Sequence, residues 1–166
     1  MTAEERIEAF KHAFRLHPAG VAVVTAQSDS GPHGLTVSSV SSVGINPLAL
    51  AFSVASTNGS AAIVLGAPRF VVNLLTDQHA DLARSFARSG APRFTPEQEW
   101  AEFESGDPYL PSARVAFLCE PLQVVPVGES SLIVATVVDI HVGERTTSLV
   151  YHDRRFSSVD ATAPEL

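Results

Sequence analysis

The sequence predicts a mainly β protein, an antiparallel barrel with peripheral helices. Short segments rich in β-branched and aromatic residues recur along the chain, and turn-forming residues separate them. The connections between most of these segments are too short for repeated parallel crossovers. The 166 residues are 45% hydrophobic, which is enough for a single core. We therefore expect one domain over residues 1–166, without a repeat or a linker.

The first seventeen residues predict an N-terminal helix. Thr2 and Glu5 have the spacing of a helix capping box. Ile7, Phe10 and Phe14 then recur at helical spacing and form one apolar stripe. Proline and glycine residues after position 17 end the helix. We expect its stripe to cover another part of the protein.

Seven segments predict strands, and short helices lie between some of them. The expected strands are residues 20–26, 33–43, 48–55, 70–75, 114–127, 131–142 and 148–151, with a last short pairing at Phe156. Short helices are expected at residues 60–65 and after a cap at Thr76 or Asp77. Residues 90–111 form a long excursion with one helical turn near residues 96–100. The tail, residues 160–166, is expected to fray.

Charge and composition exclude several classes of function. The formal net charge of −7 opposes binding to a phosphate backbone, so we expect no nucleic-acid partner. We expect no membrane partner either, because no apolar stretch reaches the length of a membrane span. The N-terminus lacks a signal-peptide pattern, which favours a cytoplasmic location. Cys119 is the single cysteine and lies in an apolar run, so we expect a packed core thiol.

Two stretches of small hydroxyl residues are candidate ligand sites. Five of the seven residues 36–42 are serine or threonine. In a strand, Thr36 and Ser38 would share one face, while Ser39 and Ser41 would share the other. Small hydroxyl residues let a flat polar ring or a phosphate approach the backbone and donate hydrogen bonds to it. A polar edge strand or a serine-rich packing face is the alternative interpretation.

The second stretch follows a predicted strand and comes before a predicted helix. It contains Ser53 and the polar residues 56–60. Free backbone N–H groups at a helix start near Ser60 would favour an anion. An ordinary helix cap and turn is the alternative.

Other catalytic and nucleotide-binding motifs are missing from the sequence. It has no GxxxxGK[ST], GxGxxG or GxSxG motif, and its six histidines lack zinc-site spacing. We therefore predict no metal site, and nothing in the sequence points to a catalytic triad. Arg84, Arg88 and Arg93 lie close in sequence and either meet one phosphate group or form a solvated helix face.

Several motifs, in order, resemble the flavin reductase family. They are PAGVAVVTA at residues 18–26, GLTVSSVSSVGINPLAL at 34–50, FVVNLL at 70–75, DLARSFA at 81–87, RF at 93–94, LCE at 118–120 and SLVYHDRRF at 148–156. The resemblance covers about residues 10–157. It implies a split β-barrel of the FMN-binding, Greek-key type, which binds FMN or FAD as a homodimer. It also implies an NAD(P)H:flavin oxidoreductase that supplies reduced flavin to a separate monooxygenase.

The resemblance also implies which residues bind the cofactors. The residues expected at the flavin are Thr36, Ser38, Ser39, Ser53, Val54, Ala55, Gly59, Ser60, Ser85 and Phe86, with the phosphate at Gly59 and Ser60 and with Ser85 and Phe86 closing the site. The residues expected at the nicotinamide donor are Tyr151, His152 and Arg154. NADH and NADPH both fit as donors. We name no catalytic acid or base, because the two cofactors carry the hydride chemistry between them.

One departure keeps other functions open. Gly128, Glu129 and Ser130 stand where the family often has Gly-Asp-His, and that histidine is associated with the nicotinamide side of the site. A flavin-binding protein without reductase turnover is therefore one alternative. A split-barrel oxidoreductase that holds its flavin tightly and acts on its own substrate is another.

Overall fold

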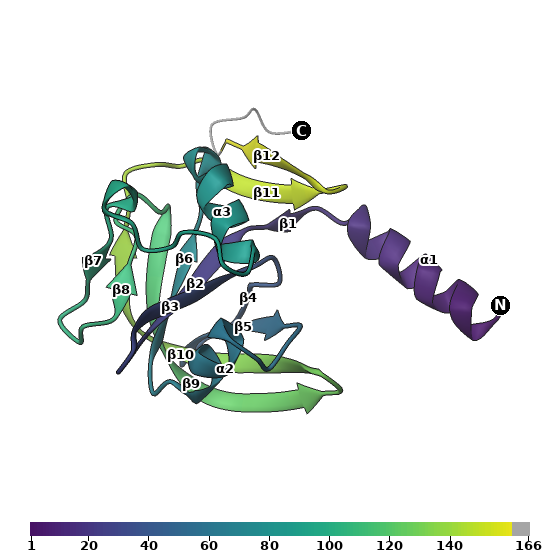
Figure 1. Ribbon diagram of the computed structural model, residues 1–166, viewed down its shortest axis with the longest axis horizontal. Coiled ribbons are helices and arrows are strands. Elements are labelled where there is room, and N and C mark those ends of the chain that lie inside the picture. The colour runs from purple at the N-terminus through teal and green to yellow at the C-terminus, as the bar shows by residue number, and fades with distance from the viewer. Residues whose placement is uncertain (161–166) are drawn as a thin grey trace.

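The computed structural model describes residues 1–160 and shows a mainly β protein built around one curled sheet (Figure 1). The sheet has seven antiparallel strands in the order β3-β2-β6-β9-β10-β5-β4. Its strands are β2 (Ala22–Ser28), β3 (Gly31–Val37), β4 (Ser41–Ile45), β5 (Leu48–Val54), β6 (Phe70–Leu74), β9 (Val115–Val127) and β10 (Ser130–Val142). From residue 161 on, the tail that we expected to fray lies outside the described residues.

Two small sheets flank the large one. The first joins β1 (Ala19–Gly20) to the hairpin of β11 (Ser148–His152) and β12 (Arg155–Val159), which confirms the expected last pairing at Phe156. The second pairs β7 (Ala101–Glu102) with β8 (Pro108–Tyr109) inside the long excursion. Strands of two residues are too short to show a periodic pattern, so this second pair was not predicted.

The expected single strand over residues 33–43 is wrong. The chain leaves the sheet after Val37 and re-enters at Ser41 on the opposite edge. At the crossing, Ser39 Oγ accepts a hydrogen bond from Ser53 N at 2.8 Å and donates one to Ser53 O at 3.1 Å. Because the sheet curls, this pair of bonds joins the end of β3 to β5. Small hydroxyl residues therefore make a crossing here rather than one face of a strand.

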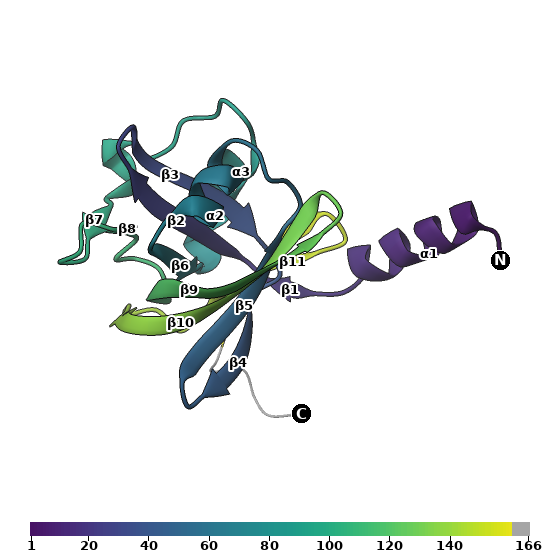
Figure 2. The same cartoon turned by 90° about the horizontal axis from the view of Figure 1, so that it is seen from below.

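Buried residues on both faces of β2 build two core clusters. Val24 packs inside the curled sheet with Phe52 and Phe70, whereas Val23 packs on the other face with Phe86. The short helix α2 (Ser60–Gly66) closes the first cluster. A 3₁₀ turn, η1 (Asp77–His79), leads from the cap at Thr76 into α3 (Ala80–Ala87), which closes the second cluster. Figure 2 shows both α-helices beside β2 and β3.

Buried polar side chains hold the long excursion against the sheet. Asn73 donates to Val23 O at 3.0 Å and accepts from Leu110 N at 2.8 Å. Thr25 Oγ1 donates to the carbonyl of Pro108. The helical turn expected near residues 96–100 is confirmed as η2 (Pro96–Gln98). These bonds keep the excursion close to the strands that carry the site.

The N-terminal helix is confirmed, but it does not cover its own chain. Helix α1 (Ala3–Arg15) has the expected capping box of Thr2 and Glu5, and none of its residues is buried. Its described ties to the body are at Asp153, which donates N–H to Arg15 O at 2.8 Å and pairs with the Arg15 side chain at 3.0 Å. In both ribbon views α1 projects away from the sheets. No helix within residues 1–160 is long and apolar enough to cross a membrane.

Candidate functional site

A cavity of about 280 Å³ opens where β3 and β5 end and β10 begins, and we call it the hydroxyl cavity. Its lining residues are Leu35, Thr36, Val37, Ser38, Ser39, Ser53, Val54, Ala55 and Ser130. The structure therefore brings together six of the residues predicted at the flavin. They come from two segments far apart in sequence, which meet because the edges of the sheet curl toward each other.

The hydroxyl groups of this cavity divide into two kinds. Thr36 Oγ1 donates to Ala83 O at 2.7 Å, and the Ser39 hydroxyl is engaged with the backbone of β5. The hydroxyls of Ser38, Ser53 and Ser130 have no hydrogen-bond partner within residues 1–160. Three unpartnered hydroxyls around one cavity suit the alternating donors and acceptors at the edge of a flat polar ring.

A second cavity, of about 660 Å³, shares a wall with the first, and we call it the arginine pocket. Its lining residues are Val21, Thr36, Val37, Ser38, Arg84, Ala87, Arg88, Tyr151, Arg154, Arg155 and Phe156. Residues 36–38 of β3 and the following turn line both cavities. Tyr151 and Arg154, which were predicted at the nicotinamide donor, line this pocket, whereas His152 does not.

Four of the residues predicted at the flavin line neither cavity: Gly59, Ser60, Ser85 and Phe86. The Ser60 hydroxyl accepts a hydrogen bond from Arg93 at 2.9 Å. Phe86 is only 1% exposed, because its ring lies under Phe94 and Trp100 with centroids 5.2 and 5.5 Å away. The apolar ring of Phe86 packs in the core, so Phe86 does not line either cavity.

Arg93 forms its hydrogen bonds with groups of the protein itself, and it does not join Arg84 and Arg88 in lining the arginine pocket. It donates Nη1–H to Gly34 O at 2.8 Å and Nη2–H to Arg88 O at 2.7 Å, and so ties β3 to the end of α3. Burial lowers the pKa of this guanidinium. The close approach of strand and helix needs a glycine at position 34, because a Cβ there would lie 2.7 Å from the Phe86 ring.

Several lining residues were outside the predicted site set, and Ser130 and Arg155 are two polar ones. Ser130 occupies the position of the family histidine discussed above, so the motif departure marks a position in the site. Arg155 lies next to the predicted Arg154, at the first position of β12. Its approach to α3 depends on how the hairpin folds back, which residue spacing alone does not reveal.

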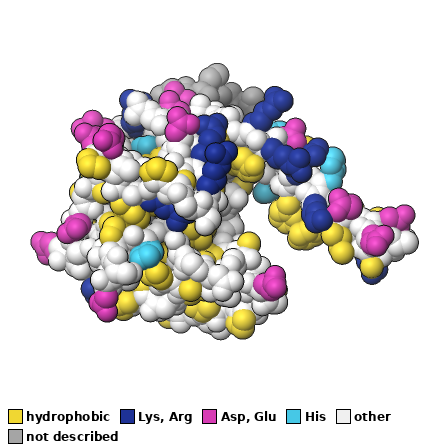
Figure 3. Space-filling view, in the orientation of Figure 1, with side chains coloured by type: hydrophobic (Ala, Val, Ile, Leu, Met, Phe, Trp, Pro, Cys, Tyr) yellow, Lys and Arg dark blue, Asp and Glu magenta, His cyan; other side chains and the backbone are white. Residues whose placement is uncertain are grey.

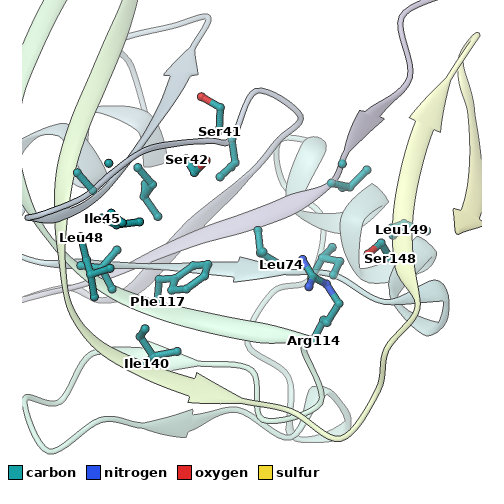
Figure 4. Close-up of a pocket in the computed structure, with 18 residues that line it drawn as sticks. Ser41, Ser42, Ile45, Leu48, Leu74, Arg114, Phe117, Ile140, Ser148 and Leu149 are labelled. Atoms are coloured by element: carbon teal, nitrogen blue, oxygen red, sulfur yellow. The ribbon is translucent and has the colours of Figure 1, made fainter. Parts of the chain in front are cut away.

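A third cavity, of about 400 Å³, is mostly apolar, and Ser41 and Ser42 of β4 form part of its wall (Figure 4). Ile45, Leu48, Phe117 and Ile140 gather at one end, and Arg114 lies at the other. The Arg114 Nε atom is buried without a hydrogen-bond partner in the described part of the chain. Because its wall is mostly hydrocarbon, this cavity offers a polar ring few partners.

Other reactive groups do not form a second centre. The Cys119 thiol is buried in the core as predicted, and burial raises its pKa to about 12, so it is a poor nucleophile. Among residues 1–160, no group of three or more His, Cys, Asp or Glu side chains is placed to hold a metal ion.

Comparisons with known proteins agree on one family. The family model described as "Flavin reductase like domain" matches residues 14–160. An NADH:FMN oxidoreductase from Rhodococcus qingshengii is 36% identical over 89% of this chain and 79% of its own length. The reductase component of an FADH2-dependent resorcinol hydroxylase from a Rhizobium species is 32% identical over 89% of this chain and 84% of its own. A flavin reductase domain protein from an Arthrobacter species has a TM-score of 0.87 at 28% identity, covering 96% of this chain and 99% of its own.

Proposed function

The chain belongs to the flavin reductase family, and on that premise we propose that it is an NAD(P)H-dependent flavin reductase supplying reduced FMN or FAD to a separate monooxygenase. The observation that carries the proposal is the pair of cavities that share residues 36–38. One is uncharged and lined with hydroxyls, and the other is basic. Such a pair suits a flavin ring beside the charged part of a nucleotide.

The residues of the hydroxyl cavity fit a flavin ring. A bound flavin would supply the redox chemistry, which is hydride acceptance from a nicotinamide donor. Ser38, Ser53 and Ser130 would bond the polar edge of the ring and fix its plane. Tyr151 and Arg154 would hold the donor from the arginine pocket, at the shared wall. The protein thus contributes proximity and orientation.

The hydroxyl cavity also fits a reaction that needs no acid or base from the protein. None of the nine residues that line it is titratable. A hydride moves between two cofactors without a proton donated by the chain, so an uncharged cavity is sufficient. The absence of a titratable residue from this lining also supports a second candidate function. Because Ser130 places no imidazole in this cavity, a flavin-binding protein without turnover is the alternative.

The proposed assembly is a homodimer. On α1, Ile7, Phe10 and Phe14 are 53, 66 and 61% exposed, and Ile45 of β4 is 89% exposed. Figure 3 shows apolar side chains on the side of α1 that faces the rest of the protein. A stable interface buries roughly 800 Å² on each partner, and exposed aromatic side chains supply such area efficiently. A second copy would cover both α1 and the apolar cavity.

Flavin-dependent oxidation of the nicotinamide tests the function. Purified protein is mixed with NADH and excess FMN, then FAD, and the loss of the nicotinamide absorbance band is followed. Rapid oxidation that requires flavin is the expected result. Measurable flavin binding without oxidation of NADH or NADPH would overturn the reductase proposal and favour the non-catalytic alternative.

The proposed monooxygenase partner rests on the family, and co-purification tests it. The proposed cytoplasmic location rests on the sequence, and cell fractionation tests it.

A further inference from the structure

The arginine pocket concentrates positive charge in an acidic protein. Of the 11 Lys and Arg residues in a chain of net charge −7, four line this one cavity: Arg84, Arg88, Arg154 and Arg155. No acidic residue lines it. In Figure 3, basic side chains gather over α3 and the β11–β12 hairpin. Like charges brought together without a counter-charge repel one another, so this cluster favours an anion.

The pocket's arginines are for the most part not neutralised by the protein itself. Arg84 pairs with the exposed Asp81 at 2.6 Å, and its guanidinium lies 5.1 Å from the Phe156 ring centroid. Arg88, Arg154 and Arg155 form no ion pair with any of residues 1–160. The nearby Asp153 pairs with Arg15 of α1 instead. Three guanidinium groups are therefore available to an anionic ligand.

The arginines come from two elements that the fold brings to one cavity. Arg84 and Arg88 are one helical turn apart at the end of α3, and Arg154 and Arg155 belong to the turn of the β11–β12 hairpin. Arg154 has φ of 62°, a conformation that favours glycine, so the turn carries a side chain where glycine would be easier to accommodate. Planar guanidinium forks on two sides of a cavity match the oxygens of phosphate groups.

The alternative phosphate position fits less well. Gly59 and Ser60, where the resemblance places the phosphate, line neither cavity, and the Ser60 hydroxyl is already bonded to Arg93. Helix α2, which begins at Ser60, has only 7 residues. By contrast, the arginine pocket adjoins the hydroxyl cavity through Thr36 and Ser38, so one ligand can extend from one cavity into the other.

We propose that Arg84, Arg88, Arg154 and Arg155 bind the phosphate groups of the nucleotide that reacts in the hydroxyl cavity. The inference rests on the proposed function for the identity of that nucleotide. The shared chemistry is a phosphate or diphosphate, carried either by the flavin or by the nicotinamide donor. The experiment separates these two sources, and it also includes an anion that tests the pocket without a nucleotide.

The test compares wild type with the double variant Arg88→Gln/Arg155→Gln. Both side chains are exposed, so the fold should be kept. The control is Lys11→Gln/Arg145→Gln, which removes the same charge outside the pocket. Flavin fluorescence titrations measure affinity for FMN and for riboflavin, which has no phosphate. Steady-state assays with riboflavin measure KM for NADH and NADPH, and thermal unfolding is followed with inorganic pyrophosphate.

If the phosphate belongs to the flavin, the pocket variant binds FMN about tenfold or more weakly, while its riboflavin affinity stays within about twofold of wild type. If the phosphate belongs to the donor, the pocket variant keeps its FMN affinity, and its KM for NADH and NADPH rises instead. The rise is larger for NADPH if the pocket also holds the additional phosphate of that donor. In either case pyrophosphate raises the Tm of wild type and control by about 2–4 °C more than that of the pocket variant.

The proposal is overturned if pyrophosphate gives the same Tm shift in wild type and pocket variant and the nucleotide affinities do not change. Equal weakening of FMN and riboflavin, or equal weakening in the control variant, would also overturn it. If wild type reduces riboflavin with NADH, and the pocket variant has the same affinities, KM values and Tm shift, this inference is refuted but the proposed function is not. A wild type that oxidises neither donor refutes the proposed function, and the pyrophosphate result still decides on the pocket.

Discussion

Serine residues that look equivalent in the sequence have different roles in the structure. The Ser39 hydroxyl bonds both the N–H and the carbonyl of Ser53, whereas the Ser38 hydroxyl has no partner in the described chain and faces the candidate site. The composition of residues 36–42 indicated a polar site, but not which hydroxyls the fold would use for itself. That division depends on how the sheet edges meet.

Substitutions at these two serines should therefore have separable effects. Ser38→Ala removes a ligand contact, so we expect flavin affinity to fall about threefold to tenfold while the free energy of unfolding stays within about 0.5 kcal/mol. Ser39→Ala removes both hydrogen bonds to the exposed backbone of Ser53 in β5, so we expect it to lose about 1 kcal/mol of stability. Fluorescence titration and urea unfolding measure the two quantities. The reverse pattern would show that the roles are wrongly assigned.

Gly34 shows how one residue fixes the distance between strand and helix. A Cβ at this position would lie 2.7 Å from Phe86 Cε1 and 3.0 Å from Val24 O. Phe86 is buried under two aromatic rings and cannot move away freely. We expect Gly34→Ala to destabilise the protein by about 1–3 kcal/mol, measured by urea unfolding. Gly66→Ala is the control, because a Cβ at Gly66 would have no other atom within 4 Å. Gly128 is unsuitable as a control, because its φ of 61° would strain an alanine.

At the scale of elements, the sequence predicted what is local and missed what is long-range. The capping box, the apolar stripe and the short helices depend on residues a few positions apart, and the structure confirms them. The break between β3 and β4 depends on Ser53, fourteen residues along the chain from Ser39, and no periodicity reports such a contact. For the same reason the arginines of α3 were noticed, while their meeting with the β11–β12 turn was not.

The turn that leads into α3 should make stability depend on pH. His79 Nδ1 accepts from Thr76 N at 3.1 Å, and its Nε2 lies 3.1 Å from the Ser112 hydroxyl. Burial lowers the pKa of His79 below its usual 6.5, with a smaller opposing effect from Asp77. The native state therefore keeps this ring neutral, while the unfolded chain takes up a proton below about pH 6.5. The stability from neutral His79 is present above that pH and is lost as pH falls.

Comparison with His79→Asn isolates this group from other titrations. We expect wild type to exceed the variant in free energy of unfolding at about pH 8, and the excess to shrink as the pH is lowered to about 5. Urea unfolding at several pH values measures the difference. An excess that stays constant or grows toward acid pH would contradict a neutral buried ring.

At the scale of the whole molecule, α1 leaves its apolar stripe uncovered by its own chain. A helix of 13 residues is marginal on its own in water, and this one buries none of them against its chain. Its C-terminal end is tied through Arg15 and Asp153 to the hairpin turn that carries Arg154. A second copy that covers α1 would therefore also steady one wall of the arginine pocket.

Charges on the apolar stripe should separate the proposed dimer. Phe10 and Phe14 are the most exposed large residues of the stripe and their rings are in contact, with centroids 4.7 Å apart. We expect Phe10→Asp/Phe14→Asp to shift the protein from dimer to monomer in sedimentation equilibrium. Glu4→Gln/Glu8→Gln changes the polar face of the same helix and should leave the dimer intact. A wild type that sediments as a monomer at all concentrations would contradict the proposed assembly.

The most direct test of the account is a crystal structure of the protein with bound FMN. We predict electron density for the isoalloxazine ring in the hydroxyl cavity, within hydrogen-bond distance of Ser38, Ser53 or Ser130. A ring located in the apolar cavity beside Phe117 and Ile140, with the hydroxyl cavity left to solvent, would contradict it.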